Sequence, residues 1–176
     1  MRRCYVGLGA NLDQPLFQLH AAANALEIMT GNQPAGRSAI YRSHPLGGPD
    51  GQPDYLNAVL ALDTTLTPLS MLDQLQIIEQ AAGRVRDVRW AARTLDLDLL
   101  LFGDTCMQHK RLTLPHPRIY ERNFVLYPLS DLLPESWTFP DHSSLEQRLA
   151  ACPDNPLQVI ENGWSLPGAD AKRLLA

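Results

Sequence analysis

The most informative part of the sequence is residues 84–102, which read RVRDVRWAARTLDLDLLLF. The first half, residues 84–93, is basic, because four arginines stand there against a single acid, Asp87. The second half places Asp96 and Asp98 between leucines. An apolar–polar alternation with a period of two residues is typical of a half-buried β-strand. We therefore predict a strand that carries both carboxylates on one face and leucines on the other.

Two aspartates on one face of a strand repel each other and lose hydration, so a cation is expected between them. Mg²⁺ takes oxygen ligands and is commonly held by one or two carboxylates, with phosphates completing its shell. Arginines just upstream reach phosphates through planar guanidinium groups, and Trp90 among them offers a flat surface for a ring. The stretch favours a magnesium–polyphosphate site. The alternative stays open, because a D-x-D pair is a weak signal and arginine runs are usually solvated.

Length and composition exclude several classes of protein. The chain has 176 residues, so we expect one domain, residues 1–176. A hydrophobic content of 45% fits a globular protein, and no apolar run approaches the roughly 20 residues of a membrane helix. A net charge of −4 argues against a general nucleic-acid binder. Three scattered cysteines and no signal-peptide pattern predict reduced thiols and a cytoplasmic location.

The hydrophobic periodicity predicts alternating strands and helices. Before the aspartate strand we expect strands at residues 4–9, 38–43 and 55–65, and helices at about residues 13–29 and 67–83. This order is the βαββαβ pattern of a ferredoxin-like α+β sandwich, with helices on one face of an antiparallel sheet. Beyond it we expect a short strand at residues 111–114, helices at residues 121–133 and 144–151, and an extension of no assigned role, about residues 154–176, packed loosely on the domain.

Seven short motifs follow one another along residues 6–140: GLGANL (7–12), PDYLNA (53–58), GRVR (83–86), RW (89–90), RTLDLD (93–98), LPHPR (114–118) and ERNFVL (121–126). In their order and spacing they resemble the 6-hydroxymethyl-7,8-dihydropterin pyrophosphokinase family of the folate pathway. The combination of RTLDLD with LPHPR at this distance is highly specific.

The resemblance implies that the hydroxymethyl oxygen of the pterin attacks the β-phosphorus of ATP and that AMP leaves. It implies four catalytic residues, of which Asp96 and Asp98 hold two Mg²⁺ ions, while Arg84 and Arg93 steady the phosphates. The implied contacts to ATP are Gln76, Glu79, Arg86, Arg89, Arg111, Thr113, His116 and Arg122. The implied contacts to the pterin are Ser43, His44, Leu46, Tyr55, Asn57, Trp90 and Phe124.

The expected partners are therefore two small molecules, ATP and the pterin, bound by a monomer. Two loops, residues 44–54 and 84–92, are expected to close over them and exclude water. Two other functions fit parts of the pattern. An RNA-binding module would use the arginines and Trp90, although Asp96 and Asp98 would repel its phosphates. A metal-dependent nucleotide hydrolase would need a base for water, and no residue stands out for that role.

Overall fold

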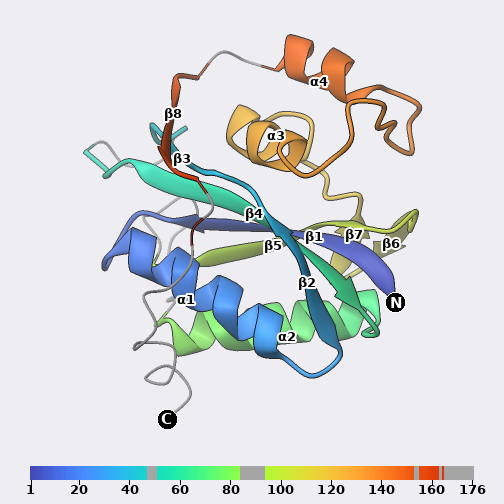
Figure 1. Cartoon of the computed structure of the whole chain (residues 1–176), viewed down its shortest axis with the longest axis horizontal. Helices are drawn as coiled ribbons and strands as arrows, with labels where there is room; N and C mark the ends of the chain where they lie inside the picture. Colours follow the sequence, from blue (N-terminus) through green and yellow to red (C-terminus); the bar gives the residue numbers. More distant parts are fainter. Residues whose placement is uncertain (47–50, 84–93, 153–154, 163, 165–176) are drawn as a thin grey trace.

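The computed structural model describes residues 1–46, 51–83, 94–152, 155–162 and 164, and its centre is one antiparallel β-sheet (Figure 1). The strands follow the order β5-β1-β4-β3-β8, and β2 also pairs with β4. Their bounds are Arg2–Ala10 for β1, Asn32–Arg37 for β2, Ile40–Ser43 for β3, Tyr55–Thr64 for β4, Asp96–Phe102 for β5 and Leu157–Glu161 for β8. A separate hairpin pairs β6 (Met107–His109) with β7 (Leu112–Leu114).

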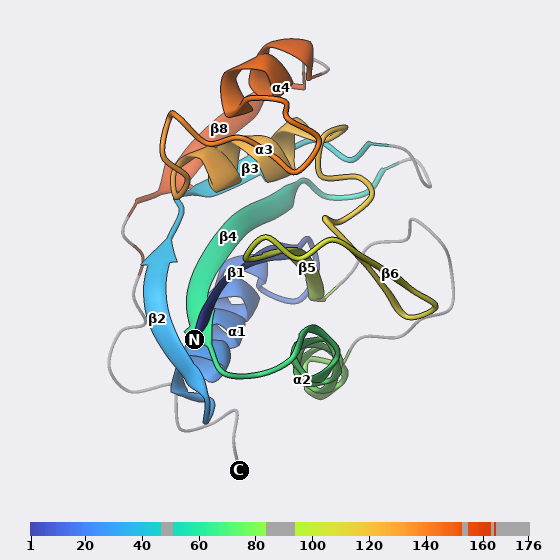
Figure 2. The ribbon, with the colours of Figure 1, turned by 90° about the vertical axis from the view of Figure 1, so that its right-hand side faces the viewer.

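Helices cover both faces of this sheet. Figures 1 and 2 show α1 (Pro15–Ile28) and α2 (Pro68–Ala81) on one side, and α3 (Asn123–Ser130) and α4 (Leu145–Ala151) on the other. The larger core lies under α1 and α2, with Leu19 and Leu75 fully buried. A second core lies under α3 and α4, around Leu126 and Leu129. The α+β class is confirmed. The expectation that helices lie on one face of the sheet holds only for α1 and α2, because α3 and α4 cover the other face.

Several element boundaries follow from local chemistry. Helix α2 begins where the Thr67 side chain accepts a hydrogen bond from the Ser70 backbone N–H at 3.2 Å, and a proline at the first turn suits the helix geometry. Gly83, at φ +76°, follows its end. Helix α3, Asn123–Ser130, is shorter at both ends than the expected residues 121–133. At its beginning, Arg122 has extended backbone angles, so the helix starts only at Asn123. Arg122 therefore immediately precedes the first residue of α3.

The prediction missed strand β2. Its sequence, NQPAGR, contains proline and glycine, which disfavour a regular strand. The pairing of β2 with β4 shifts register between Pro34 and Gly36, so the strand absorbs both residues at an irregularity. In the described residues the expected second strand, residues 38–43, corresponds to β3, β2 is an additional strand before it, and β6, β7, α3, α4 and β8 follow β5.

The prediction of a loosely packed C-terminal extension was wrong for residues 155–162 and Trp164, and the rest of the extension lies outside the described residues. Strand β8 pairs with β3 and extends the sheet. Trp164 is only 2% exposed and belongs to the larger core. Its Nε1–H donates to the Ser38 carbonyl at 2.7 Å, and the Arg37 guanidinium lies 4.8 Å from its ring centroid. A buried indole with a satisfied N–H is a strong anchor, which the composition of the extension did not reveal.

None of the helices in the described ranges is both long and apolar enough to cross a membrane.

Candidate functional site

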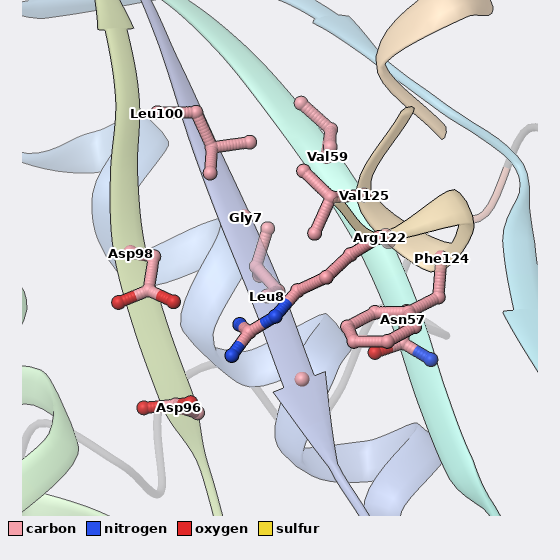
Figure 3. Close-up of a pocket in the computed structure, with 12 residues that line it drawn as sticks. Gly7, Leu8, Asn57, Val59, Asp96, Asp98, Leu100, Arg122, Phe124 and Val125 are labelled. Atoms are coloured by element: carbon pink, nitrogen blue, oxygen red, sulfur yellow. The ribbon is translucent and has the colours of Figure 1, made fainter. Parts of the chain in front are cut away.

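A hollow, partly open to solvent, lies between the sheet and the start of α3 (Figure 3). Its floor is strand β1, whose Gly9 pairs with Asp96 of β5 on one side and with Asn57 of β4 on the other. Gly7 takes the same place next to Asp98. Cross-strand partners project their side chains on the same face. Gly9 therefore leaves open space between Asp96 and Asn57, while the Leu100 side chain packs over Gly7.

These glycines were absent from the predicted site, although their spacing carries the signal. A Cβ on Gly9 would lie 3.6 Å from Asn57 Oδ1 and 4.0 Å from Asp96 Cβ. Any larger side chain at that position would grow into the hollow. A G-x-G pattern on one strand and a D-x-D pattern on another match in period, but only the sheet register shows that they lie opposite each other.

The two carboxylates lie as the alternation predicts. Asp96 and Asp98 both line the hollow, while Leu97 and Leu99 are buried on the opposite face, in the larger core. Strand β5 is the last of the described strands at this end of the sheet. The backbone N–H of Leu97 donates to Oε1 of the buried Glu79 of α2 at 2.8 Å. A core on one face and a charged acceptor at the edge thus hold the D-x-D backbone in place.

The opposite wall comes from the start of α3. Arg122 and Phe124 line the hollow, and the Arg122 guanidinium carbon lies 5.7 Å from the Phe124 ring centroid. In Figure 3 the Arg122 side chain reaches across β1 toward the strand that carries the carboxylates. Burial, and then the charge of Arg118, lower the pKa of Arg122, while Asp98 and Asp96 act in the opposite direction. The wall therefore presents a cation and an aromatic face.

His116 lies beside the carboxylates, with Nε2 3.9 Å from Asp98 Oδ2. Its Nδ1 accepts the backbone N–H of Arg118 at 3.2 Å, so the ring hydrogen is on Nε2 in the neutral form. Burial lowers the pKa of His116, Asp98 raises it in part, and Arg122 lowers it further. The result is a neutral imidazole whose Nε2–H lies on the side of Asp98, next to the hollow but not in its lining.

The side chain of Asn57 is held in place by Ser43. Its Nδ2 donates to Ser43 Oγ at 2.9 Å, and both residues are buried. With Nδ2 engaged there, Oδ1 is the amide atom next to the floor position of Gly9. The amide therefore offers an acceptor to the hollow.

Other predicted contacts lie outside the lining of the hollow. Arg111 forms an ion pair with Asp73 of α2, and Glu79 bonds to the backbone of β5. His44 pairs with Asp54 at 2.7 Å, which joins the two ends of the 44–54 loop, of which residues 47–50 are outside the described part. Ser43 and His116, described above, are also outside the lining, and the remaining predicted residues that are described but do not line the hollow are Leu46, Tyr55, Gln76 and Thr113.

The arginine stretch cannot be placed in the same way. The predicted residues Arg84, Arg86, Arg89, Trp90 and Arg93 all lie outside the described residues, as does the expected 84–92 loop.

The donor chemistry suits Mg²⁺ that arrives with phosphate. Within the described ranges no three His, Cys, Asp or Glu side chains cluster closely enough to hold a metal by themselves. Asp96 and Asp98 supply two carboxylates on one face. Mg²⁺ usually binds through one or two carboxylates, with water and phosphate oxygens for the rest. The site thus fits magnesium bound together with a polyphosphate better than a cage made entirely of protein.

Comparisons with known proteins agree on one family. The family model described as 7,8-dihydro-6-hydroxymethylpterin-pyrophosphokinase (HPPK) matches residues 5–134, more than half of the chain. The 2-amino-4-hydroxy-6-hydroxymethyldihydropteridine pyrophosphokinase of Pseudomonas aeruginosa is 48% identical over 169 residues, which cover 96% of this chain and 99% of the relative. The enzyme of the same name from Haemophilus influenzae is 48% identical over 132 residues, covering 75% of this chain and 82% of the relative.

Among solved structures, wild-type Plasmodium falciparum HPPK-DHPS with SDX-DHP superposes with a TM-score of 0.65 at 14% identity. The match covers 85% of this chain but only 43% of that larger chain, and it supports the fold alone. The alternatives of an RNA-binding module and a nucleotide hydrolase are not favoured by any of these matches. On the strength of the family model and the relatives at 48% identity, the chain belongs to the 7,8-dihydro-6-hydroxymethylpterin-pyrophosphokinase family.

Proposed function

We propose that the hollow between β5, β1 and β4 is where this pyrophosphokinase transfers pyrophosphate from ATP to the hydroxymethyl group of 6-hydroxymethyl-7,8-dihydropterin, with release of AMP. The observation that carries the proposal is the register around Gly9, which places Asp96 on one side of an open floor and Asn57 on the other. The Asp96 carboxylate, proposed to bind metal, thus faces the neutral amide of Asn57 across the space above Gly9. Such a division suits a charged and an uncharged substrate held side by side.

The carboxylate side is the proposed place of the triphosphate. Asp96 and Asp98 would hold Mg²⁺, which when bound would offset the negative charge of the phosphates. Arg122, on the facing wall, adds a cation over the same floor. Phosphoryl transfer depends mainly on positioning and charge compensation. Arg84 and Arg93, from outside the described part, are proposed to complete that compensation.

His116 is proposed to bind a phosphate oxygen. Its neutral ring has the hydrogen on Nε2, beside Asp98. A neutral donor contacts phosphate without competing with the metal for the carboxylate. Together with Arg122, it would orient the phosphate chain toward the pterin.

The amide side is the proposed place of the pterin. Asn57 Oδ1 is the acceptor next to the floor, and an amino group on the edge of the pterin ring is a matching donor. Phe124 supplies an aromatic face of the kind on which a flat bicyclic ring stacks. Ser43 acts from behind, through its bond to Asn57. The proposed contacts of Tyr55, His44, Leu46 and Trp90 to the pterin complete this side.

The ATP contacts of Gln76, Glu79, Arg86, Arg89, Arg111 and Thr113 belong to the same proposal. So do two Mg²⁺ ions, a monomeric and cytoplasmic enzyme, a single domain over residues 1–176, and a ferredoxin-like core formed by the elements from β1 to β5.

The decisive test is the release of AMP from ATP. We expect AMP only when both magnesium and the pterin are present, and the product should carry the pyrophosphate. Asp96→Ala should lower kcat by at least about a hundredfold, since it removes a metal ligand and little of the core. Asp63→Ala is the matched control, because Asp63 lies at the far end of β4 and pairs with Arg3. Equal activity of the two variants at ordinary magnesium would contradict the assignment.

A further inference from the structure

We infer that the C-terminal segment, which comprises residues 155–162 together with Trp164, positions the side of the site that is proposed to bind the pterin. The segment lies beyond residues 5–134, which the family model matches. It contacts two separate elements that carry residues of that side, strand β3 and the start of α3. The inference rests on the proposed function, because it assumes that Asn57 and Phe124 face the pterin.

The first contact runs through strand β3. In the sheet, β8 covers the edge of β3 that β4 leaves open, and Leu157 lies opposite Ser43. Ser43 in turn lies opposite Tyr55 of β4 and accepts the Asn57 amide at 2.9 Å. Without β8, the four-residue strand β3 would be the edge of the sheet, with one side of its backbone unpaired. The Ser43 hydroxyl, which orients Asn57, would then belong to a frayed edge strand.

The second contact runs through the start of α3. Asn123 is buried, and its Nδ2 donates to the Asn155 carbonyl at 2.6 Å. Its two neighbours in sequence, Arg122 and Phe124, both line the hollow. A bond from the residue between them fixes the first turn of the helix, and with it the direction of both side chains. Asn155 is itself buried, so the bond is shielded from water.

The far end of the segment is anchored in the core. The Arg37 guanidinium donates to the Trp164 carbonyl at 2.9 Å and forms a two-pronged ion pair with Glu27 at 2.8 and 2.6 Å. His20 packs edge-on against the Trp164 ring, with centroids 5.0 Å apart. Glu161 lies 3.4 Å from His20. The segment is therefore held at both ends and can transmit the rigidity of the core to β3 and α3.

The position of the segment makes its effect selective. Strand β8 lies at one end of the sheet and β5, with Asp96 and Asp98, lies at the other, separated by three strands. Loosening the segment should disturb Asn57 and Phe124 while leaving the carboxylates in place. Because Arg122 shares the start of α3 and is proposed to contact ATP, a positioning role predicts a higher KM for the pterin and a smaller rise in the KM for ATP.

The test compares two asparagines that make the same kind of bond. Asn123→Ala removes the bond to the C-terminal segment. The control, Asn32→Ala, removes a bond of this kind from Nδ2 to the Leu26 carbonyl at 2.9 Å, far from the hollow at the turn between α1 and β2, and it also removes the acceptor of the Thr64 hydroxyl. Both variants should lower the melting temperature. Only Asn123→Ala should raise the KM for the pterin, by roughly fivefold or more, the loss expected for one net hydrogen bond. If Asn123→Ala does not fold, Trp164→Phe, which loses the bond to Ser38 but keeps an aromatic ring, should show a smaller shift in the same direction.

Steady-state release of AMP is measured with each substrate varied in turn, and hydrogen exchange of β3 is followed in parallel. Faster exchange in β3, together with a larger rise in the KM for the pterin than in the KM for ATP, supports the inference. Unchanged KM values in an active, folded Asn123→Ala enzyme overturn it, as does an equal change in the Asn32→Ala control. A wild-type protein that releases no AMP with both substrates present overturns the proposed function as well, so the two failures are distinguishable.

Discussion

Glu79 offers the sharpest test of how the carboxylates are held. Its carboxylate is buried, and Oε1 accepts the Leu97 N–H at 2.8 Å, on the edge of β5 that no other described strand of the main sheet covers. Glu79→Ala would leave that N–H without this acceptor in a buried place. An unpaired buried donor costs about 1–3 kcal/mol, and a bond to a charged group is at the upper end of the range. We therefore expect the free energy of unfolding to fall by about 2–3 kcal/mol.

For a domain of this size, 1 kcal/mol shifts Tm by roughly 2–4 °C, so the substrate-free protein should melt roughly 4–12 °C lower. Glu79→Gln keeps a carbonyl oxygen as acceptor and should lose only about half as much. Because Leu97 lies between Asp96 and Asp98, we also expect kcat of Glu79→Ala to fall at least about tenfold.

The assay is thermal unfolding of the apoprotein, followed by kinetics with saturating ATP and magnesium. A different outcome separates the two roles proposed for Glu79. If the side chain acts only by contacting ATP, the alanine variant will keep the wild-type Tm without substrate and show a raised KM for ATP. That result would refute the idea that Glu79 holds the backbone of β5 in place.

Three further predictions concern other parts of the chain. Burial raises the pKa of the Cys4 thiol to about 12, whereas Cys106 is exposed. Because only the thiolate reacts, a thiol reagent at about pH 8 should modify Cys106 and spare Cys4. Peptide mass mapping would reveal which cysteine is modified. Trp164→Ala should lower the free energy of unfolding by about 3–5 kcal/mol in urea titrations, and a loss near zero would mean that the segment does not anchor there. Gly9→Val should fill the floor beside Asn57 and lower kcat/KM for the pterin at least about tenfold at nearly unchanged Tm; full activity would place the pterin elsewhere.

Part of the candidate site could be predicted where the chemistry is local. The alternation of leucine and aspartate placed Asp96 and Asp98 on one face of a strand, and the leucine side of β5 is indeed in the core. Thr67 with Pro68 marked the beginning of α2, because capping groups lie within one turn of the backbone they satisfy. Such patterns need no partner from elsewhere in the chain.

Other features could not be predicted, because the residues that stabilise them are distant in sequence. Strand β2 has an unfavourable composition and forms because β4 offers it a backbone to pair with. The C-terminal segment is polar and rich in turn-forming residues, yet Trp164 finds its acceptor at Ser38 and Asn155 its donor at Asn123. Propensity describes what a segment prefers alone, and tertiary contacts routinely override it.

The amino-acid sequence alone indicated the class of fold, the family resemblance and the common strand face of Asp96 and Asp98, since these depend on local patterns and on the order of motifs along the chain. The tertiary structure decided the register that puts Gly9 between Asp96 and Asn57, the bond from Glu79 to the backbone of β5, and the docking of the C-terminal segment. The physical reason is that hydrogen bonds and packing act over a few ångströms in space, whatever the separation in sequence, and only the folded sheet brings these groups within that range.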